Sequence, residues 1–280
     1  MARFIDPRVD WAFKRIFGSE DTKECLITFL NGLFEDELVI KDVTFAKTEK
    51  LGLRPDDRGV VFDVYCITNE GKHVIVEMQK KEQEYFADRA LYYTARAIVQ
   101  QGIRGIWDYH LAPVYTVCFM DFVSQSPILK EFRTDLVLTD LQTRQQVSDR
   151  MRIVYLQLPL FDKHTEAECM DIFDCWIYIV KNMNMFEQMP FSEKYPVFRK
   201  LAEIGDLRKL SREELELYDE DIKNMRDIYA TRKFDEKKGM EIGMAKGMEK
   251  GMAKGMAKGM AKGMEKEKLA TARRLLSMGL

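Results

Sequence analysis

Two strongly apolar segments carry acidic residues at positions where a buried strand has none. The sequence VVFDVYCI at 60–67 places Asp63 among β-branched and aromatic residues, and HVIVEMQ at 73–79 ends with Glu77 and Gln79. A carboxylate buried on a sheet is unfavourable unless a cation compensates it, and a divalent metal ion is a common compensation. The two segments therefore predict a pair of strands that carries a metal site.

The overall charge excludes one class of nucleic-acid-binding protein. The 280 residues include 46 acidic and 44 basic side chains, which leaves a formal net charge of −2. A protein that binds nucleic acid indiscriminately carries a global basic field, and this chain has none. Any site for a polyanion must be local, in a chain long enough to bury a substantial core within one or two domains.

Several features of the chain bear on its compartment. The first ten residues, MARFIDPRVD, carry charges and a proline instead of an apolar run, and no apolar stretch of eighteen residues occurs later. We therefore expect a cytoplasmic protein without a membrane partner. The cysteines are odd in number, scattered and without a C-x-x-C pair, which indicates buried thiols and not disulfides or zinc ligands. They are Cys25, Cys66, Cys118, Cys169 and Cys175.

Two helices are predicted before the first strand. Asp6 and Pro7 are typical of an N-cap and a first helical position, and apolar residues then recur at helical spacing up to Gly18. A second helix is expected over residues 25–31, and Gly32 is expected to end it.

A meander of strands, a helix and a further strand are predicted next. The meander covers residues 43–48, 60–68 and 73–79, the helix 85–103, and the last strand 113–122. Asn69-Glu70-Gly71 is a hairpin-type turn between the second and third strands. A buried strand after a helix implies a crossover onto the same sheet. The predicted fold is a mixed α/β (α+β) sheet with the order α, β, β, β, α, β.

We predict four parts along the chain. Residues 1–163 form the sheet-bearing core with further strands at 132–138 and 152–158, residues 164–234 a helical region with helices at 166–185 and 201–230, residues 235–268 a low-complexity tail of KGME and KGMA repeats, and residues 269–280 a terminal amphipathic helix. The repeat is not expected to belong to the core.

The repeat is at best a marginal helix. Its seven glycines each cost about 1 kcal/mol relative to alanine in a helix interior, so tertiary or partner contacts would have to support it. A four-residue repeat advances by about 40° per step, so the glycines cannot form a sustained coiled-coil seam. The lysine in most repeats excludes a membrane span. A spacer expanded by repeat slippage and a mildly basic arm that contacts DNA or a second subunit both remain open.

The paired acids support a specific chemistry. Asp63 and Glu77, on antiparallel strands, can reach one edge and share a Mg²⁺ ion, with the backbone carbonyl of Met78 as a further oxygen ligand. Such an ion polarises a phosphodiester and lowers the pKa of a bound water that attacks phosphorus. Gln79 lies on the same face as Glu77 and can orient that water or bind a phosphate oxygen, but it supplies no positive charge.

These residues resemble a known nuclease core. Asp63, a gap of thirteen residues and Glu77-x-Gln79 resemble the PD-(D/E)XK nucleases, with glutamine in place of the usual lysine. The opening DPRVDWAFKRIFG, the segment TFLNG, and Phe86 with Arg89, Tyr92 and Tyr93 resemble the Rpn family of recombination-promoting nucleases, also called transposase-like proteins. The resemblance covers residues 5–165.

The resemblance implies a metal-dependent DNA endonuclease with an αβββαβ core, linked to DNA recombination and mobile elements. It implies Mg²⁺ as cofactor, with Mn²⁺ as a substitute, and DNA as partner. Family members carry a repetitive helical tail followed by a short helical module. We expect that module to be missing here and the terminal helix to be truncated, because the chain ends at Leu280.

The family's roles carry over onto individual residues. Asp63 and Glu77 become metal ligands, and Gln79 takes the position of the catalytic lysine. Asp10 is a candidate for the acid that the first helix often contributes; alternatively it only favours the positive end of that helix. Arg89 is a candidate for holding a phosphate beside the site.

Alternatives remain open for the site and for the function. Asp63 alternatively faces solvent on an edge strand, or pairs with Arg58 or Lys72. The leading functional hypothesis is a dimeric endonuclease of low sequence specificity, because two cuts need two active sites. A catalytically weak nuclease fold that binds DNA or protein is the second, motivated by the glutamine. The third is a structural or inhibitory partner whose tail docks on a longer relative.

Overall fold

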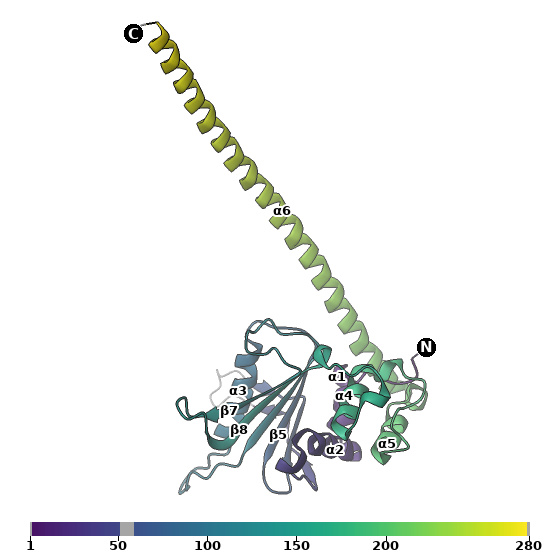
Figure 1. The fold of residues 1–280 in the computed structure, drawn as a ribbon. Helices are drawn as coiled ribbons and strands as arrows, with labels where there is room; N and C mark the ends of the chain where they lie inside the picture. Colours follow the sequence, from purple (N-terminus) through teal and green to yellow (C-terminus); the bar gives the residue numbers. More distant parts are fainter. Residues whose placement is uncertain (1, 51–58, 279–280) are drawn as a thin grey trace. The chain divides into compact units, whose positions relative to one another are not determined.

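The computed structural model describes residues 2–50 and 59–278 (Figure 1). The chain divides into two compact units, residues 1–222 and residues 223–280. The first unit contains the sheet and most of the helices, and the second contains the remainder of one long helix. Arg58, named above as one potential partner of Asp63, lies outside the described residues.

A six-stranded mixed sheet forms the centre of the first unit. Its strands in spatial order are β1 (Val43–Phe45), β4 (Val64–Thr68), β5 (His73–Gln79), β6 (Val114–Met120), β8 (Gln146–Gln157) and β7 (Arg133–Thr139). Antiparallel pairing joins β1 to β4, β4 to β5 and β7 to β8, and parallel pairing joins β5 to β6 and β6 to β8. A separate two-stranded ladder pairs β2 (Glu49–Lys50) with β3 (Val60–Val61).

Helices cover both faces of this sheet (Figure 1). The helices of the first unit include α1 (Asp10–Phe17), α2 (Lys23–Phe34), α3 (Phe86–Val99), α4 (Ile172–Asn182) and α5 (Pro196–Ile204). A further helix, α6 (Arg212–Ser277), begins in the first unit and continues into the second. On one face Phe86 and Ala90 of α3 pack against Cys118. On the other, the rings of Phe13 in α1 and Phe29 in α2 lie 5.7 and 5.0 Å from that of Phe119. Alternation along β6 thus directs neighbouring side chains into two different cores.

The predicted mixed α/β fold with the order α, β, β, β, α, β is confirmed. The strand predicted at 73–79 has those bounds, and it pairs with β4 through a turn in which Gly71 has a φ of 78°, a conformation that favours glycine. The crossover through α3 then makes β6 parallel to β5.

The first helix ends at Gly18 as predicted, but its predicted start and the predicted end of the second helix are wrong. The side chain of Asp6 accepts hydrogen bonds from the backbone N–H and the guanidinium of Arg8, so it forms a local turn and α1 begins only at Asp10. Gly32 does not end α2, which continues to Phe34. A Cβ there would lie 2.9 Å from Ile172 Cγ2, so this glycine permits a close approach to α4.

Two other predicted elements are interrupted. The strand expected over 60–68 breaks at Phe62 and Asp63, where Asp63 makes side-chain bonds to β5. The helix expected over 201–230 stops at Gly205 and restarts at Arg212, because Asp206 accepts hydrogen bonds from Arg208 between the two helices. In each case the side chain of an acid accepts a backbone hydrogen bond where regular structure is interrupted.

The second unit, taken by itself, is helical up to Ser277. A Cβ built on any glycine of the repeat meets nothing within 4 Å, and its methionines are exposed by 64–74%. The support that such a glycine-rich helix requires is therefore not supplied by contacts within the described part of the chain.

The remaining expectations concern cysteines and membranes. All five cysteines are free and buried, as predicted. In the part of the chain that the structure describes, no helix is long and apolar enough to cross a membrane.

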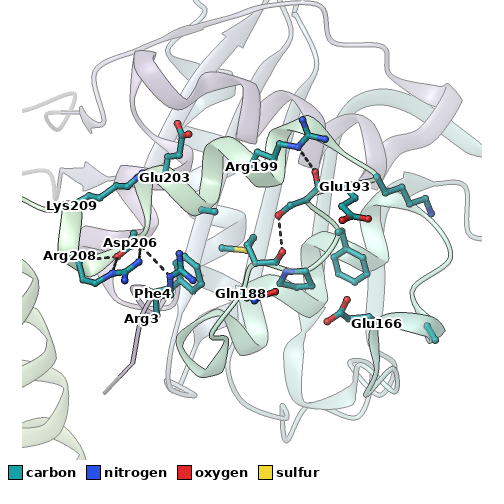
Figure 2. A pocket seen from close by; sticks show the side chains of 17 residues that line it. Arg3, Phe4, Glu166, Gln188, Glu193, Arg199, Glu203, Asp206, Arg208 and Lys209 are labelled. Atoms are coloured by element: carbon teal, nitrogen blue, oxygen red, sulfur yellow. Dashed lines mark hydrogen bonds and ion pairs between the residues drawn. The ribbon is translucent and has the colours of Figure 1, made fainter.

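We expect Asp206→Asn to destabilise the first unit in a pH-dependent way. Asp206 is 1% exposed and lies between Arg208 and Arg3 (Figure 2). Hydrogen bonds from Arg208, despite burial, hold the pKa of Asp206 well below its usual range. Such a carboxylate stabilises the native state above its ordinary pKa and loses this effect as the pH falls. The variant should lose about 2 kcal/mol of unfolding free energy at pH 7.

Urea unfolding of wild type and variant at several pH values measures this loss. The difference should shrink as the pH falls from about 4 towards 2. Glu203→Gln, which removes an exposed acid from α5, serves as the matched control and should have little effect. A loss that is the same at pH 7 and pH 2 would contradict the ionic origin.

Candidate functional site

Asp63 and Glu77 face each other where β4 and β5 come together. The register pairs Val64 with Val76, and one further step opposes Asp63 to Glu77 on one face of the hairpin. The backbone N–H of Met78 donates to Asp63 Oδ2 at 2.8 Å, and the N–H of Asp63 donates to Glu77 Oε1 at 3.1 Å. Each carboxylate thus accepts a backbone hydrogen bond from the neighbouring segment, which holds the two acids together.

This pair is electrostatically unfavourable without a cation. Glu77 is only 5% exposed. Burial, followed by the charge of Asp63, raises its pKa to about 8. Burial also raises the pKa of Asp63, although the hydrogen bond from Met78 opposes this shift. At neutral pH the pair therefore retains a proton unless positive charge is brought to it.

Gln79 is buried and held from two sides. Its Oε1 accepts a hydrogen bond from the Arg89 guanidinium of α3, and its Nε2 donates to the carbonyl oxygen of Lys81 at 2.9 Å. Arg89 also donates to Gln83 Oε1 at 2.8 Å and lies over the rings of Phe86 and Tyr93. The charge of Arg89 lowers the pKa of both acids. The predicted Gln79 and Arg89 are thus brought together beside the pair.

Asp10 approaches the pair from the other face of the sheet. It lies in the first turn of α1 and forms an ion pair with Lys14, with 2.8 Å between Oδ2 and Nζ. The charge of Asp10 contributes to the raised pKa of Asp63, which places it within electrostatic reach. Its side chain is about half exposed, so it is not buried with the other two acids.

The donor set suits a small, hard divalent cation. Among the described residues, no group of three or more His, Cys, Asp or Glu side chains is arranged to hold a metal ion. Mg²⁺ needs fewer, because it typically takes one or two carboxylates and completes its shell with water and phosphate oxygens. Asp63 Oδ1 and Glu77 Oε2 make no hydrogen bond within the described part of the chain. A buried and a half-buried carboxylate with one oxygen each to spare therefore fit the ion.

The other sequence candidates lie outside this pair. Lys72 pairs with Glu70 and not with Asp63. His73 contacts the hydroxyl of Tyr65, at the opposite end of β5. Arg96 of α3 is buried, with 6% of its surface exposed.

The aromatic side chains on α3 and in the loop after it differ in their surroundings. Tyr93 packs edge-on against Phe62, and Tyr92 is 42% exposed on α3. Trp107 lies 4.8 Å from Tyr109, between ring centroids.

A cavity of about 1000 Å³ lies elsewhere in the first unit (Figure 2). Its lining includes Arg3, Arg199, Asp206 and Arg208, and none of the candidate site residues. These charged groups are already engaged, since Asp206 pairs with both Arg3 and Arg208, and Arg199 donates to the carbonyl of Ser192. The cavity therefore adds nothing to the acidic pair.

Lys14 is the residue at the site that the sequence did not single out. Its charge lowers the pKa of Asp63 and of Glu77. In the sequence it resembles any lysine on the polar side of a short helix, so only its four-residue spacing from Asp10 offered a signal.

Comparison with known proteins adds a family to this geometry. No curated protein and no solved structure matches the chain. The profile of the PD-(D/E)XK nuclease family transposases matches residues 7–233, which include both acids, Gln79, Arg89 and the helices that surround them. The match spans most of the 280 residues. The chain therefore belongs to the PD-(D/E)XK nuclease family transposases.

Proposed function

We propose that this chain is a Mg²⁺-dependent DNA endonuclease of low sequence specificity, acting in DNA recombination or on mobile elements. The observation that carries the proposal is the pair of carboxylates, half-buried Asp63 and buried Glu77, which backbone hydrogen bonds hold together at the start of β4 in a member of a nuclease family. Burying two acids side by side is unfavourable, and a bound divalent cation gives the arrangement a physical reason.

The residues that would hold the cation are Asp63, Glu77 and the backbone carbonyl of Met78. Mn²⁺ is expected to substitute, since it also accepts oxygen ligands. When bound, the ion supplies a Lewis acid for a phosphodiester oxygen and a water of lowered pKa. Asp10, one turn before Lys14 on α1, is a candidate for a water-mediated contact to the same ion.

Gln79 and Arg89 would act on the substrate. One N–H of the Gln79 amide is used by the Lys81 carbonyl, which leaves the second for a water or a phosphate oxygen. Arg89 fixes the amide so that its oxygen faces α3 and its nitrogen faces the end of β5. Its guanidinium also brings positive charge close to the acids and to a phosphate bound beside them.

Several broader assignments belong to the same proposal. We infer membership of the Rpn group, a cytoplasmic location, and action as a homodimer, since two strands require two active sites. We also retain the division into a nuclease core at 1–163, a helical region at 164–234, a repeat at 235–268 and a terminal helix at 269–280.

A second function is favoured by one specific observation. Gln79 carries no charge, and its amide oxygen is already bound by Arg89. A nuclease fold with a weakened site could bind DNA or protein as a regulatory component. Retention of both Asp63 and Glu77 argues against this alternative, because a fold released from catalysis gains nothing from two buried acids.

We expect the purified chain to nick supercoiled plasmid with Mg²⁺ or Mn²⁺ and not with EDTA. Asp63→Asn and Glu77→Gln preserve side-chain size but remove the charges that hold the ion. Each should lower the cleavage rate at least about 100-fold, since the ion contributes several kcal/mol to the transition state. Gel electrophoresis of the plasmid over time measures the rate.

The matched control for this assay is Asp149→Asn, which changes an exposed acid on β8 and should cleave like wild type. Absence of cleavage by folded wild-type protein with every metal, or equal cleavage by the variants, would transfer support to the regulatory alternative.

Metal binding should also appear as a change in stability. Because folding raises the pKa of Glu77 from 4.5 to about 8, the native state binds more protons than the unfolded state between those pH values. Stability of the metal-free protein therefore falls as the pH rises through this range. In EDTA at pH 8, Glu77→Gln should melt at a higher temperature than wild type, with little difference near pH 4.

Addition of Mn²⁺ should reverse this order, because an ion that binds only the native state raises its stability. Calorimetric melting of both proteins with Mn²⁺ and with EDTA measures the effect. If Mn²⁺ raised the melting temperature of wild type and of Glu77→Gln equally, the ion would bind elsewhere.

A further inference from the structure

The candidate site has no lysine on the strand that carries Glu77. Gln79 occupies that position, is 8% exposed, and has its amide oxygen bound by Arg89. Hydrolysis of a phosphodiester places additional negative charge on the phosphate oxygens, so a cation beside the phosphate favours the reaction. The question is which side chain of this chain supplies it.

Lys14 lies on α1, and its charge lowers the pKa of both acids. The helix packs against the sheet next to the acids: Phe13 contacts Phe119, which pairs with Met78 in the register of β5 and β6. At the end of the same helix, a Cβ on Gly18 would lie 3.4 Å from Cγ2 of Val64, the neighbour of Asp63. Lys14 lies between these two contacts along α1.

The ammonium group of Lys14 is held by Asp10 and remains accessible. Nζ donates to Asp10 Oδ2 at 2.8 Å, and the Lys14 side chain is 43% exposed. Lys14 and Asp10 both line a cavity of about 420 Å³, so open space adjoins the amine. Burial lowers the pKa of Lys14, but the hydrogen bond and charge of Asp10 raise it on balance, so the group stays protonated.

Two other cations near the site, Arg89 and Lys80, are less suited to this role. The guanidinium of Arg89 bonds two glutamines and stacks over two rings, an arrangement that fixes Gln79. The pKa of Lys80 is lowered by burial, against the charges of Asp6 and Asp221. To contact a phosphate, Lys14 would have to break only its ion pair with Asp10, a half-exposed acid, and such ion pairs contribute little to stability.

We propose that Lys14 contacts the scissile phosphate and supplies the positive charge that Gln79 lacks, a role that rests on the proposed nuclease function. The site is then assembled from two elements, with the acids on the hairpin and the cation on α1. Asp10 is the positioning residue that orients Lys14 before substrate arrives.

The role of Lys14 is electrostatic and leaves its proton in place. The attacking water forms a new bond to phosphorus and releases a proton to solvent. The bond between phosphorus and the leaving oxygen breaks, and that oxygen takes a proton from solvent. The ammonium group stabilises the charge on the phosphate oxygens during these events.

Lys14→Cys followed by aminoethylation tests this role directly. Alkylation with 2-bromoethylamine converts a cysteine into a lysine analogue, and the five native cysteines are buried with thiol pKa values raised by burial, so Cys at position 14 reacts selectively. We expect Lys14→Cys to lose about 100-fold in kcat for plasmid cleavage. Aminoethylation should restore most of it, and Lys14→Arg should retain part.

The matched control is Lys23→Cys, which receives the same aminoethylation. Lys23, the first residue of α2, also forms ion pairs with acids, Asp42 and Glu20. It should cleave like wild type before and after treatment. Melting temperatures of all variants check folding.

Three outcomes would overturn the proposal. Wild-type cleavage by Lys14→Cys would leave the nuclease function intact and remove Lys14 from it. Loss of cleavage without recovery after aminoethylation, in a folded variant, would show that the side chain acts other than through its charge. Failure of wild-type protein to cut DNA with any metal would remove the nuclease function and this inference together.

Discussion

Two backbone N–H groups cross between β4 and β5 and each donates to the carboxylate on the other side. Met78 donates to Asp63, and Asp63 donates to Glu77. These bonds take the place of ladder hydrogen bonds where β4 breaks off, so the acids are located by the backbone and not by flexible side-chain contacts. A slip of one of these strands by one residue would turn its acid to the opposite face, away from the other acid. The geometry of the site therefore depends on the register of this hairpin.

These two hydrogen bonds hold the acids together although their negative charges repel each other. Burial and mutual repulsion raise both pKa values, and in the described structure the cations that act on both acids come from helices on opposite faces of the sheet, Lys14 from α1 and Arg89 from α3. The layered fold thus has a functional consequence. Helices on both faces of the sheet bring positive charge to the same strand from two sides. The strand cannot supply this charge itself, because Gln79 stands in place of a lysine.

Features set by periodicity were predictable from the sequence. The bounds of β5, the hairpin at Gly71 and the crossover to β6 follow from apolar alternation and one turn. Helix ends were less predictable: Asp6 was read as a cap and bonds Arg8 instead, and Gly32 was read as a stop and allows close packing on α4. Such choices depend on partners distant in the sequence.

The candidate site was predictable to a similar degree. The proximity of Asp63 and Glu77 follows from strand register alone, because antiparallel neighbours share a face. The bond from Arg89 to Gln79 depends on how α3 lies on the sheet, and the approach of Lys14 depends on how α1 does. Neither packing has a signature in a single sequence. Lys14 in particular has the pattern of a solvated helix residue.

The most direct measurement is anomalous diffraction from crystals of the protein grown with Mn²⁺. The account predicts a single strong peak between the carboxylates of Asp63 and Glu77, with oxygen ligands at about 2.1 Å, and loss of that peak in Glu77→Gln crystals. A wild-type crystal with the two acids hydrogen-bonded to each other and no ion between them, or with Mn²⁺ bound elsewhere, would contradict it.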